Sequence, residues 1–422
     1  METICAILAI APTRKLFIQQ LDVKGAYLNG KLKERIYMRQ PEGHDNGTGR
    51  ICLLIKTLYG LKQAGQEWNL EFDAKLRKKG YKWLWSDTCM YIWRIGDDFV
   101  TITVWVDDML TFVTTVDLQK KAKADVESKW EITDLGIPSK IIGIELTISL
   151  DSIFISSSKY IDSILLREDL GRTNSVSMPL NPNITLVPNP EGSDGDQSNL
   201  FASLLGELQY IANTTRPDIT YAVNRLAAYT ANPSLQHHTA LKQILRYLSG
   251  TRTHGITYKA LPDCPNFFSG YIDASYGNVD KYRSITRYVF LAGEGAITWC
   301  LRKQNSIVLS STQAEYVALS EAAHEACWLW NLYMELGLLD ENVPTLIRGD
   351  NDRSLAMAQN PLFYKRSKHI AICWHWVCKL VQEGTITVDS CHNPKQTADI
   401  LTKALPHQKH TRHVAKMGLA SA

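Results

Sequence analysis

Hydrophobic and polar positions alternate along some stretches of the chain and recur every three or four residues along others. Runs of β-branched and aromatic residues predict strands, because such side chains fit the pleated surface of a sheet. These runs lie at residues 17–23, 91–95, 99–105, 109–113, 267–274, 288–291, 296–301 and 346–350. Apolar residues at helical spacing predict helices. They lie at residues 204–211, 219–226 and 241–248.

A polar segment separates the early strands from these helices. Residues 180–200 are rich in Pro, Asn, Gly and Ser, a composition that predicts a linker. Farther on, the cluster at 310–312 is Ser-Ser-Thr, which can cap a helix that begins there. Another helix is expected at 397–402. Strands and helices thus alternate in the last part of the chain, which predicts an α/β domain.

Asp107 and Asp108 lie between two predicted strands, where we expect them to form a two-residue turn. Two adjacent carboxylates on a tight, apolar hairpin repel each other, so the pKa of one should rise. A divalent cation removes this cost by binding both oxygens, and such ions commonly serve phosphoryl transfer. An ordinary solvated turn is the alternative. The nearby run Gly96–Asp98 has the composition of such a solvated turn.

A second set of carboxylates lies in the predicted α/β part. Asp273 and Asp350 end predicted strands, Glu315 lies in the first turns of the helix that begins near 310, and Asp399 lies on the late helix. Side chains placed at strand ends and on neighbouring helices can meet at one edge of a sheet, so we expect a two-metal site there. For Asp399, a local cap or ion pair is the alternative.

Four ordered motifs in the first part of the chain resemble those of reverse transcriptases from Copia-type LTR retrotransposons. The motifs are Leu21–Gly30, Ile36–Gly43, Leu58–Ala64 and Val104–Leu110. The resemblance implies a polymerase palm, an antiparallel sheet covered by helices. It also implies that Asp22, Asp107 and Asp108 hold two Mg²⁺ ions beside a primer 3′-hydroxyl and an incoming deoxynucleoside triphosphate.

The same resemblance implies roles for residues that contact the substrates. Tyr27 matches the aromatic residue whose bulk excludes a 2′-hydroxyl, a steric form of discrimination. An ordinary packed aromatic is the alternative for this side chain. Gly60, Lys62 and Gln63 match the loop that shapes the pocket for nucleotide and template.

This region also departs from the family pattern. Trp105 replaces the usual Tyr, and Gly65–Gln66 replaces Pro-Arg, which removes a bidentate phosphate contact. Only 21 residues precede Asp22, where the family has a fingers region, so we expect the fingers to be missing. Residues 4–12 are apolar and follow Glu2 without a basic residue, which predicts a buried palm helix rather than a signal peptide or a membrane span.

Three motifs around the second set of carboxylates resemble the Copia-type ribonuclease H. They are Ser310–Tyr316, Asp350–Ala356 and Ala398–Leu405. The resemblance implies a ribonuclease H fold that hydrolyses the RNA strand of an RNA–DNA hybrid. The reaction would use two Mg²⁺ ions, with Mn²⁺ as a substitute, and the 2′-hydroxyl would help to distinguish RNA from DNA.

Other residues near these motifs leave alternatives open. Ile285 and Arg287 stand where the family usually has Ser and Gly, and Ala371 stands where an Asp is common. Such changes spare the carboxylates and can disturb packing. His392 could assist product release, and a surface histidine is the alternative.

The expected organisation is a multidomain protein of the α/β and α+β classes. We expect a palm and thumb remnant at 1–180, a linker and helical connection at 181–262, a ribonuclease H-like domain at 263–410, and a tail at 411–422. The implied partners are an RNA template, a DNA primer, an RNA–DNA hybrid and deoxynucleoside triphosphates. A second copy or other parts of the polyprotein are further partners. A non-catalytic nucleic-acid-binding remnant of a decayed element is the alternative.

Composition agrees with an intracellular enzyme. The chain has 422 residues and a net charge of +3, too small by itself to indicate nucleic-acid binding. Nine cysteines, an odd number, indicate reduced thiols. The spacing of His369, Cys373, His375 and Cys378 fits no standard zinc finger. We expect no membrane association and a location in the cytoplasm, within a virus-like particle, and in the nucleus.

Overall fold

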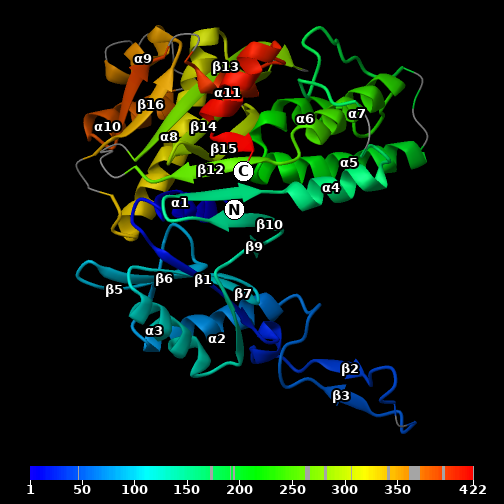
Figure 1. The fold of residues 1–422 in the computed structure, drawn as a ribbon, viewed down its shortest axis with the longest axis vertical. Helices are drawn as coiled ribbons and strands as arrows, with labels where there is room; N and C mark the ends of the chain where they lie inside the picture. The colour runs from blue at the N-terminus through cyan, green and yellow to red at the C-terminus, as the bar shows by residue number, and fades with distance from the viewer. Residues whose placement is uncertain are drawn as a thin grey trace. The chain divides into compact units, whose positions relative to one another are not determined.

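The contacts within the chain divide it into two compact units (Figure 1). The computed structural model describes residues 1–45, 47–171, 174–190, 192, 195–261, 267–279, 283–305, 307–339, 343–360, 371–391 and 395–421. The small unit is Lys15–Pro138, and the large unit combines Met1–Arg14 with Ser139–Ala422. This grouping differs from the boundaries predicted at 180, 262 and 410, because the first helix and the strands after Ser139 pack with the C-terminal part of the chain.

The small unit is built on a six-stranded sheet in the order β4-β5-β6-β7-β1-β8. Its strands are β1 (Phe17–Val23), β4 (Lys82–Trp83), β5 (Met90–Ile95), β6 (Asp98–Trp105), β7 (Asp108–Val113) and β8 (Ile132–Gly136). Helices α2 (Ala64–Lys78) and α3 (Val116–Glu127) share one apolar core with this sheet (Figure 1). A short helix η1 (Ala26–Asn29) and a separate hairpin, β2 (Tyr37–Arg39) with β3 (Ile51–Leu53), complete the unit.

The hairpin between β6 and β7 differs by one residue from the predicted turn. Trp105 pairs with Asp108, so the two turn residues are Val106 and Asp107, and Asp108 is the first residue of β7. Val106 has a φ of +55°, which a β-branched residue rarely adopts. The indole Nε1 of Trp68 donates a hydrogen bond of 2.9 Å to the Val106 carbonyl. The fold therefore holds this strained turn in place. The other Asp pair behaves as predicted, since Gly96 and Asp97 form an exposed turn.

A mixed five-stranded sheet in the order β15-β14-β13-β16-β17 forms the α/β part of the large unit. Its strands are β13 (Phe268–Val279), β14 (Arg283–Ala292), β15 (Gly295–Lys303), β16 (Thr345–Gly349) and β17 (Ile386–Ser390). The first three pair antiparallel, whereas β13, β16 and β17 pair parallel. Helix α8 (Ser311–Glu335) packs on β13 and β14, and α10 (Ala371–Gln382) and α9 (Asp352–Gln359) pack on α8. The alternation predicted from the sequence is confirmed here.

A second sheet in the large unit has the order β18-β12-β11-β10-β9. Its strands are β9 (Lys140–Ile141), β10 (Ile144–Ile148), β11 (Ser152–Ser156), β12 (His254–Lys259) and β18 (Leu419–Ser421). The predicted tail is therefore part of the fold. Helix α11 (His407–Lys416) precedes β18, and β18 pairs antiparallel with β12, which satisfies its backbone hydrogen bonds.

The helical block predicted after the linker is present. It contains α5 (Gly195–Thr214), η2 (Pro217–Ile219), α6 (Thr220–Ala227) and α7 (Leu235–Gly250), and α4 (Ser158–Arg167), which precedes the linker, joins it. Their apolar faces form one core cluster, which also takes in Leu180 and Leu186 from the predicted linker. In the described parts of the chain, no helix combines the length and the apolar character that a membrane crossing requires.

The N-terminal helix α1 (Glu2–Ile10) corrects one prediction. It is helical and buried as expected, yet it packs on β12, β14 and β15 of the large unit rather than on the palm sheet. The Tyr333 hydroxyl donates a hydrogen bond of 3.0 Å to the Ala6 carbonyl. Residues 3–10 are all buried, and a helix that is apolar on every side must be covered on every side. The space between the two sheets of the large unit provides that cover.

Candidate active sites

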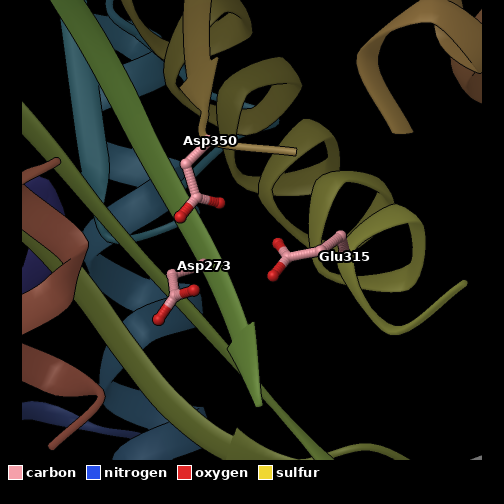
Figure 2. A group of neighbouring side chains, drawn as sticks. All are labelled: Asp273, Glu315 and Asp350. Carbon is pink, nitrogen blue, oxygen red and sulfur yellow. The ribbon is translucent and has the colours of Figure 1, made fainter. Parts of the chain in front are cut away.

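Three carboxylates of the large unit meet at one edge of the mixed sheet. Asp273 lies on β13, Asp350 directly follows the neighbouring parallel strand β16, and Glu315 lies in the first turns of α8. Figure 2 shows their carboxylates turned toward one another. Each offers an oxygen within 4.8 Å of those of the other two, and among the described residues no other three metal-ligating side chains meet so closely.

Local capping explains how two of these side chains are positioned. The Ser310 hydroxyl accepts a hydrogen bond from the Gln313 backbone N–H, which starts α8 shortly before Glu315 and confirms the predicted cap. The Asn351 side chain accepts a hydrogen bond of 3.0 Å from the Ser354 N–H, which starts α9 immediately after Asp350. The end of β16 and the start of α9 thus define where Asp350 stands.

Burial and mutual repulsion dominate the electrostatics of this cluster. Asp273 is 6% exposed and Glu315 is 7% exposed, whereas Asp350 is more open to solvent. Burial raises the pKa of the Glu315 carboxyl, and the charges of Asp273 and Asp350 raise it further. Burial also raises the pKa of Asp273, although Arg287 and the Thr402 hydroxyl oppose that shift. Without a bound cation, ionisation of this group is costly.

The donor set fits a divalent metal ion. Glu315 Oε1 accepts a hydrogen bond of 3.1 Å from the Ala274 backbone N–H, whereas the buried Oε2 has no hydrogen-bond partner within the part of the chain that the structure describes. A buried carboxylate oxygen without a donor is unfavourable. Because this oxygen belongs to a cluster of carboxylates, it suits a hard cation such as Mg²⁺ or Mn²⁺. Asp273, Glu315 and Asp350 would hold that ion.

The fourth predicted carboxylate lies beside this cluster rather than in it. Asp399 is buried on the short 3-10 helix η6 (Thr397–Leu401), which lies where a late helix was predicted. Its oxygens are not among those within 4.8 Å of one another. Its charge still raises the pKa of Asp273, and Lys403 Nζ lies 3.9 Å from its Oδ2. Gln396 donates a hydrogen bond of 2.8 Å to the Ile272 carbonyl, which joins η6 to β13.

Two side chains that touch Asp273 were not predicted as site residues. Thr402 donates its hydroxyl hydrogen bond to Asp273 Oδ2. Arg287 is the cross-strand neighbour of Asp273, and its Nη1 lies 3.7 Å from Asp273 Oδ2. The sequence marked Arg287 only as a large residue at a position where the family has Gly. The strand pairing was needed to show that it faces the site. His392 and the zinc candidate His369 lie outside the described residues.

The small unit brings the three predicted palm aspartates to one end of its hairpin. Asp22 on β1 is paired in register with Asp108 on β7, and the Val23 N–H donates a hydrogen bond of 2.8 Å to the Asp107 carbonyl. Burial raises the pKa of Asp22, and the charges of Asp108 and Asp107 add to that shift. Their oxygens are not close enough to one another to form a compact ligand group.

The carboxylates of the palm hairpin are held by neighbouring side chains. The Tyr59 hydroxyl lies 3.0 Å and 2.9 Å from the two carboxylate oxygens of Asp107 and donates its hydrogen bond there. Asp108 Oδ1 accepts a hydrogen bond of 3.3 Å from the Gln20 amide. Tyr59 belongs to the motif Leu58–Ala64, and the sequence indicated no role for it. Its contact with Asp107 could be recognised only from the structure.

The substrate-contact candidates lie around this tyrosine. The ring of Tyr27 is 4.9 Å from that of Tyr59, centre to centre, and also packs against the apolar core. Gly60 has a φ of +92° in the turn after Tyr59, a conformation that favours glycine. Lys62 is exposed, and Gln63 immediately precedes α2. The packed position of Tyr27 is compatible with both interpretations of this residue.

Comparison with known proteins relates the chain to a family. A family model described as reverse transcriptase (RNA-dependent DNA polymerase) matches residues 1–182. The retrovirus-related Pol polyprotein from transposon TNT 1-94 of Nicotiana tabacum is 34% identical over 420 residues, which is 97% of this chain and 31% of that protein. The corresponding polyprotein from transposon RE1 of Arabidopsis thaliana is also 34% identical, over 98% of this chain and 28% of its own length. The chain therefore spans about a third of the length of these relatives.

A solved structure shares the fold across both units. The structure of the foamy viral protease-reverse transcriptase in complex with RNA/DNA hybrid covers 95% of this chain and 46% of its own, with a TM-score of 0.52 and 14% identity. At this identity, the likeness shows the fold alone. It confirms the predicted classes, with a reverse transcriptase palm in the small unit and a ribonuclease H-like α/β domain in the large unit. The chain belongs to the Copia-type retrotransposon Pol polyproteins, of which it carries the reverse transcriptase and ribonuclease H portion.

Proposed function

We propose that the large unit hydrolyses the RNA strand of RNA–DNA hybrids at Asp273, Glu315 and Asp350. The observation that carries the proposal is the close group of three carboxylates in which no described residue donates a hydrogen bond to the buried Glu315 Oε2. Two Mg²⁺ ions, or Mn²⁺ in their place, would activate water and stabilise the leaving oxygen. The related foamy viral fold, solved with an RNA/DNA hybrid, supports this choice of substrate.

The carboxylates of the site differ in their contacts and in their exposure to solvent. Glu315 offers its unpartnered oxygen to the metal while the Ala274 N–H holds its other oxygen in place. Asp350, the more open of the three carboxylates, stands where a phosphate can approach. Asp399 lies beside the cluster, and the positive charge of Lys403 Nζ lies 3.9 Å from its Oδ2.

Removal of the metal tests this proposal. We expect the full chain to shorten a labelled RNA strand in a hybrid when Mg²⁺ or Mn²⁺ is present, and to leave it intact in EDTA. The same RNA as a single strand and the matching DNA duplex serve as control substrates. A folded protein that binds the hybrid and leaves it uncut in both metals would contradict the proposal. If that binding also fell steeply with salt, the result would favour the non-catalytic nucleic-acid-binding alternative.

We propose DNA synthesis on an RNA template as a second activity, carried by the palm. The supporting observation is the register that places Asp22 beside Asp108, with Asp107 in the adjoining turn. A primer, a template and deoxynucleoside triphosphates are the proposed partners, and Mg²⁺ is the proposed cofactor. Asp22, Asp107 and Asp108 would hold that ion, and the Tyr59 hydroxyl would orient the Asp107 carboxylate. We also propose that the protein acts inside the cell together with other parts of the polyprotein or a second copy.

The Asp108→Asn variant tests the palm. We expect it to abolish primer extension on an RNA template and to leave hybrid cleavage by the large unit unchanged, because Asp108 belongs to the other compact unit. Asp97→Asn, in the exposed turn at the other end of β6, is the matched control and should extend primers as the parent does. Extension that survives Asp108→Asn would argue against the palm as the polymerising site.

A further inference from the structure

A positively charged side chain lies inside the acidic cluster of the large unit. Arg287 on β14 is 2% exposed. Its Nη1 lies 3.7 Å from Asp273 Oδ2, and its Nη2 donates a hydrogen bond of 3.0 Å to the Ser275 hydroxyl. Among the described residues, its Nε and Nη1 have no hydrogen-bond partner. Because a guanidinium has five N–H donors, this buried cation is far from satisfied by hydrogen bonds alone.

The surrounding charges explain why Arg287 stays buried. Burial lowers the pKa of the Arg287 guanidinium, and this shift is opposed first by Asp273, then by Tyr221, Glu315 and Asp399. A buried charge persists only when opposite charge compensates it. The charge of Arg287 is therefore stabilised by the acidic cluster. In turn, Arg287 balances one negative charge of the cluster, that of Asp273.

We propose that Arg287 is a resident counter-ion of the acidic cluster, which competes with a divalent metal ion for Asp273 and thereby weakens metal binding. The proposal rests on the metal site proposed above. Arg287 would raise the concentration of divalent metal ion that is needed to fill the site.

The geometry supplies the physical reason. A metal ion bound to Asp273 would stand within a few ångströms of the guanidinium, and two positive charges in a poorly solvated site repel strongly. Thr402 donates its hydrogen bond to the same oxygen that faces Arg287. Asp273 Oδ2 is therefore already engaged by two partners, so this oxygen is less available to a metal ion.

Metal binding by the full chain tests the proposal without any need for catalysis. All variants carry Asp107→Asn and Asp108→Asn, so that the palm contributes little binding. We expect Arg287→Met and Arg287→Gln to bind Mn²⁺ at least about tenfold more tightly than the parent, by calorimetry or by electron paramagnetic resonance of free Mn²⁺. Tenfold corresponds to about 1.4 kcal/mol. Arg287→Lys retains the charge and should bind as the parent does.

A matched control removes a different arginine from the same sheet. Arg302 on β15 pairs with Glu321 of α8 at 3.0 Å and is exposed, so Arg302→Gln changes the net charge equally without touching Asp273. Its affinity for Mn²⁺ should stay within about twofold of the parent value. An equal gain in Arg302→Gln and in Arg287→Met would overturn the proposal, because net charge alone would then explain the effect.

The remaining outcomes are also decisive. Unchanged or weaker Mn²⁺ binding in folded Arg287→Met and Arg287→Gln would overturn the proposal. Failure of both variants to fold would overturn it as well, since Arg287 would then serve the packing of β14. Tighter binding without any hybrid cleavage would uphold the role of Arg287 and reject the proposed hydrolysis. If the parent cleaves the hybrid and the Arg287 variants bind Mn²⁺ with unchanged affinity, the proposed hydrolysis is upheld and the role of Arg287 is rejected.

Discussion

Replacement of Asp350 by Asn is expected to reduce cleavage of the RNA strand in a hybrid by about a thousandfold. Asp350 is one of the three carboxylates whose oxygens lie within 4.8 Å of one another. An amide of the same size keeps the shape and removes the charge that a metal needs. Loss of metal-assisted stabilisation costs several kcal/mol, and each 1.36 kcal/mol is tenfold in rate. The measurement is single-turnover cleavage of a labelled hybrid in Mg²⁺.

A neighbouring carboxylate provides the control for this experiment. Asp352 lies two residues later, in the first turn of α9, and accepts a hydrogen bond of 2.7 Å from the Ser390 hydroxyl. It is exposed and does not belong to the close group. Asp352→Asn should therefore cleave at nearly the parent rate. The role given to Asp350 would be wrong if both variants lost activity equally, or if Asp350→Asn kept full activity.

Replacement of Asp218 by Asn is expected to lower the free energy of unfolding of the large unit by about 3–5 kcal/mol. Arg216 and Asp218 are 0% and 2% exposed. Two parallel hydrogen bonds of 2.9 Å and 2.7 Å join the guanidinium to the carboxylate, and the Tyr247 hydroxyl donates a third bond of 2.7 Å to Asp218 Oδ2. The amide would leave the charge of Arg216 buried and uncompensated.

The stability change should be read within the helical block, because two compact units need not unfold together. Hydrogen exchange of the α7 amides in increasing urea reports on this block. The exposed pair Arg252 and Asp162, 3.8 Å apart, offers the control. Asp162→Asn should change stability by less than about 1 kcal/mol. Equal effects of Asp218→Asn and Asp162→Asn would contradict the assigned role of the buried pair.

The same pair predicts a pH dependence. Burial by itself raises the pKa of Asp218, but the Arg216 charge, the hydrogen bonds from Arg216 and that from Tyr247 outweigh it, so the net pKa is lowered. A carboxyl with a lowered pKa contributes stability that is fully present above the unfolded value of about 4. This contribution is lost as the pH falls through the folded value. The Asp218→Asn variant should therefore lose less stability on acidification than the parent.

Local patterns along the sequence were sufficient to predict the elements that carry the candidate carboxylates. The runs at 17–23 and 99–113 became β1, β6 and β7, because β-branched and aromatic residues favour a sheet regardless of its partners. The Ser-Ser-Thr cluster near 310 became the cap of α8, since a cap depends on residues three apart in the chain. The motifs likewise indicated Asp273, Glu315 and Asp350, whose approach follows from strand ends and a helix start.

Contacts between distant residues required the tertiary structure. The helix at 2–10 was predicted, but its packing in the large unit depends on which apolar surface can cover it on all sides. The position of Asp108 in β7 depends on the register of the hairpin, because a slip of one residue sends a side chain to the opposite face. The bond from Tyr59 to Asp107 joins residues 48 positions apart, beyond the reach of any local pattern.

Arg287 is the clearest example of a residue whose position only the tertiary structure shows. The sequence by itself determined the family and predicted the candidate carboxylates with the strand ends and helix starts that carry them, since these depend on residue type and spacing. Only the tertiary structure decided that Arg287 lies opposite Asp273, because cross-strand pairing joins residues that the sequence keeps apart. Because of that pairing and of burial, the charge of Arg287 is not solvated and lies beside the opposite charge of Asp273.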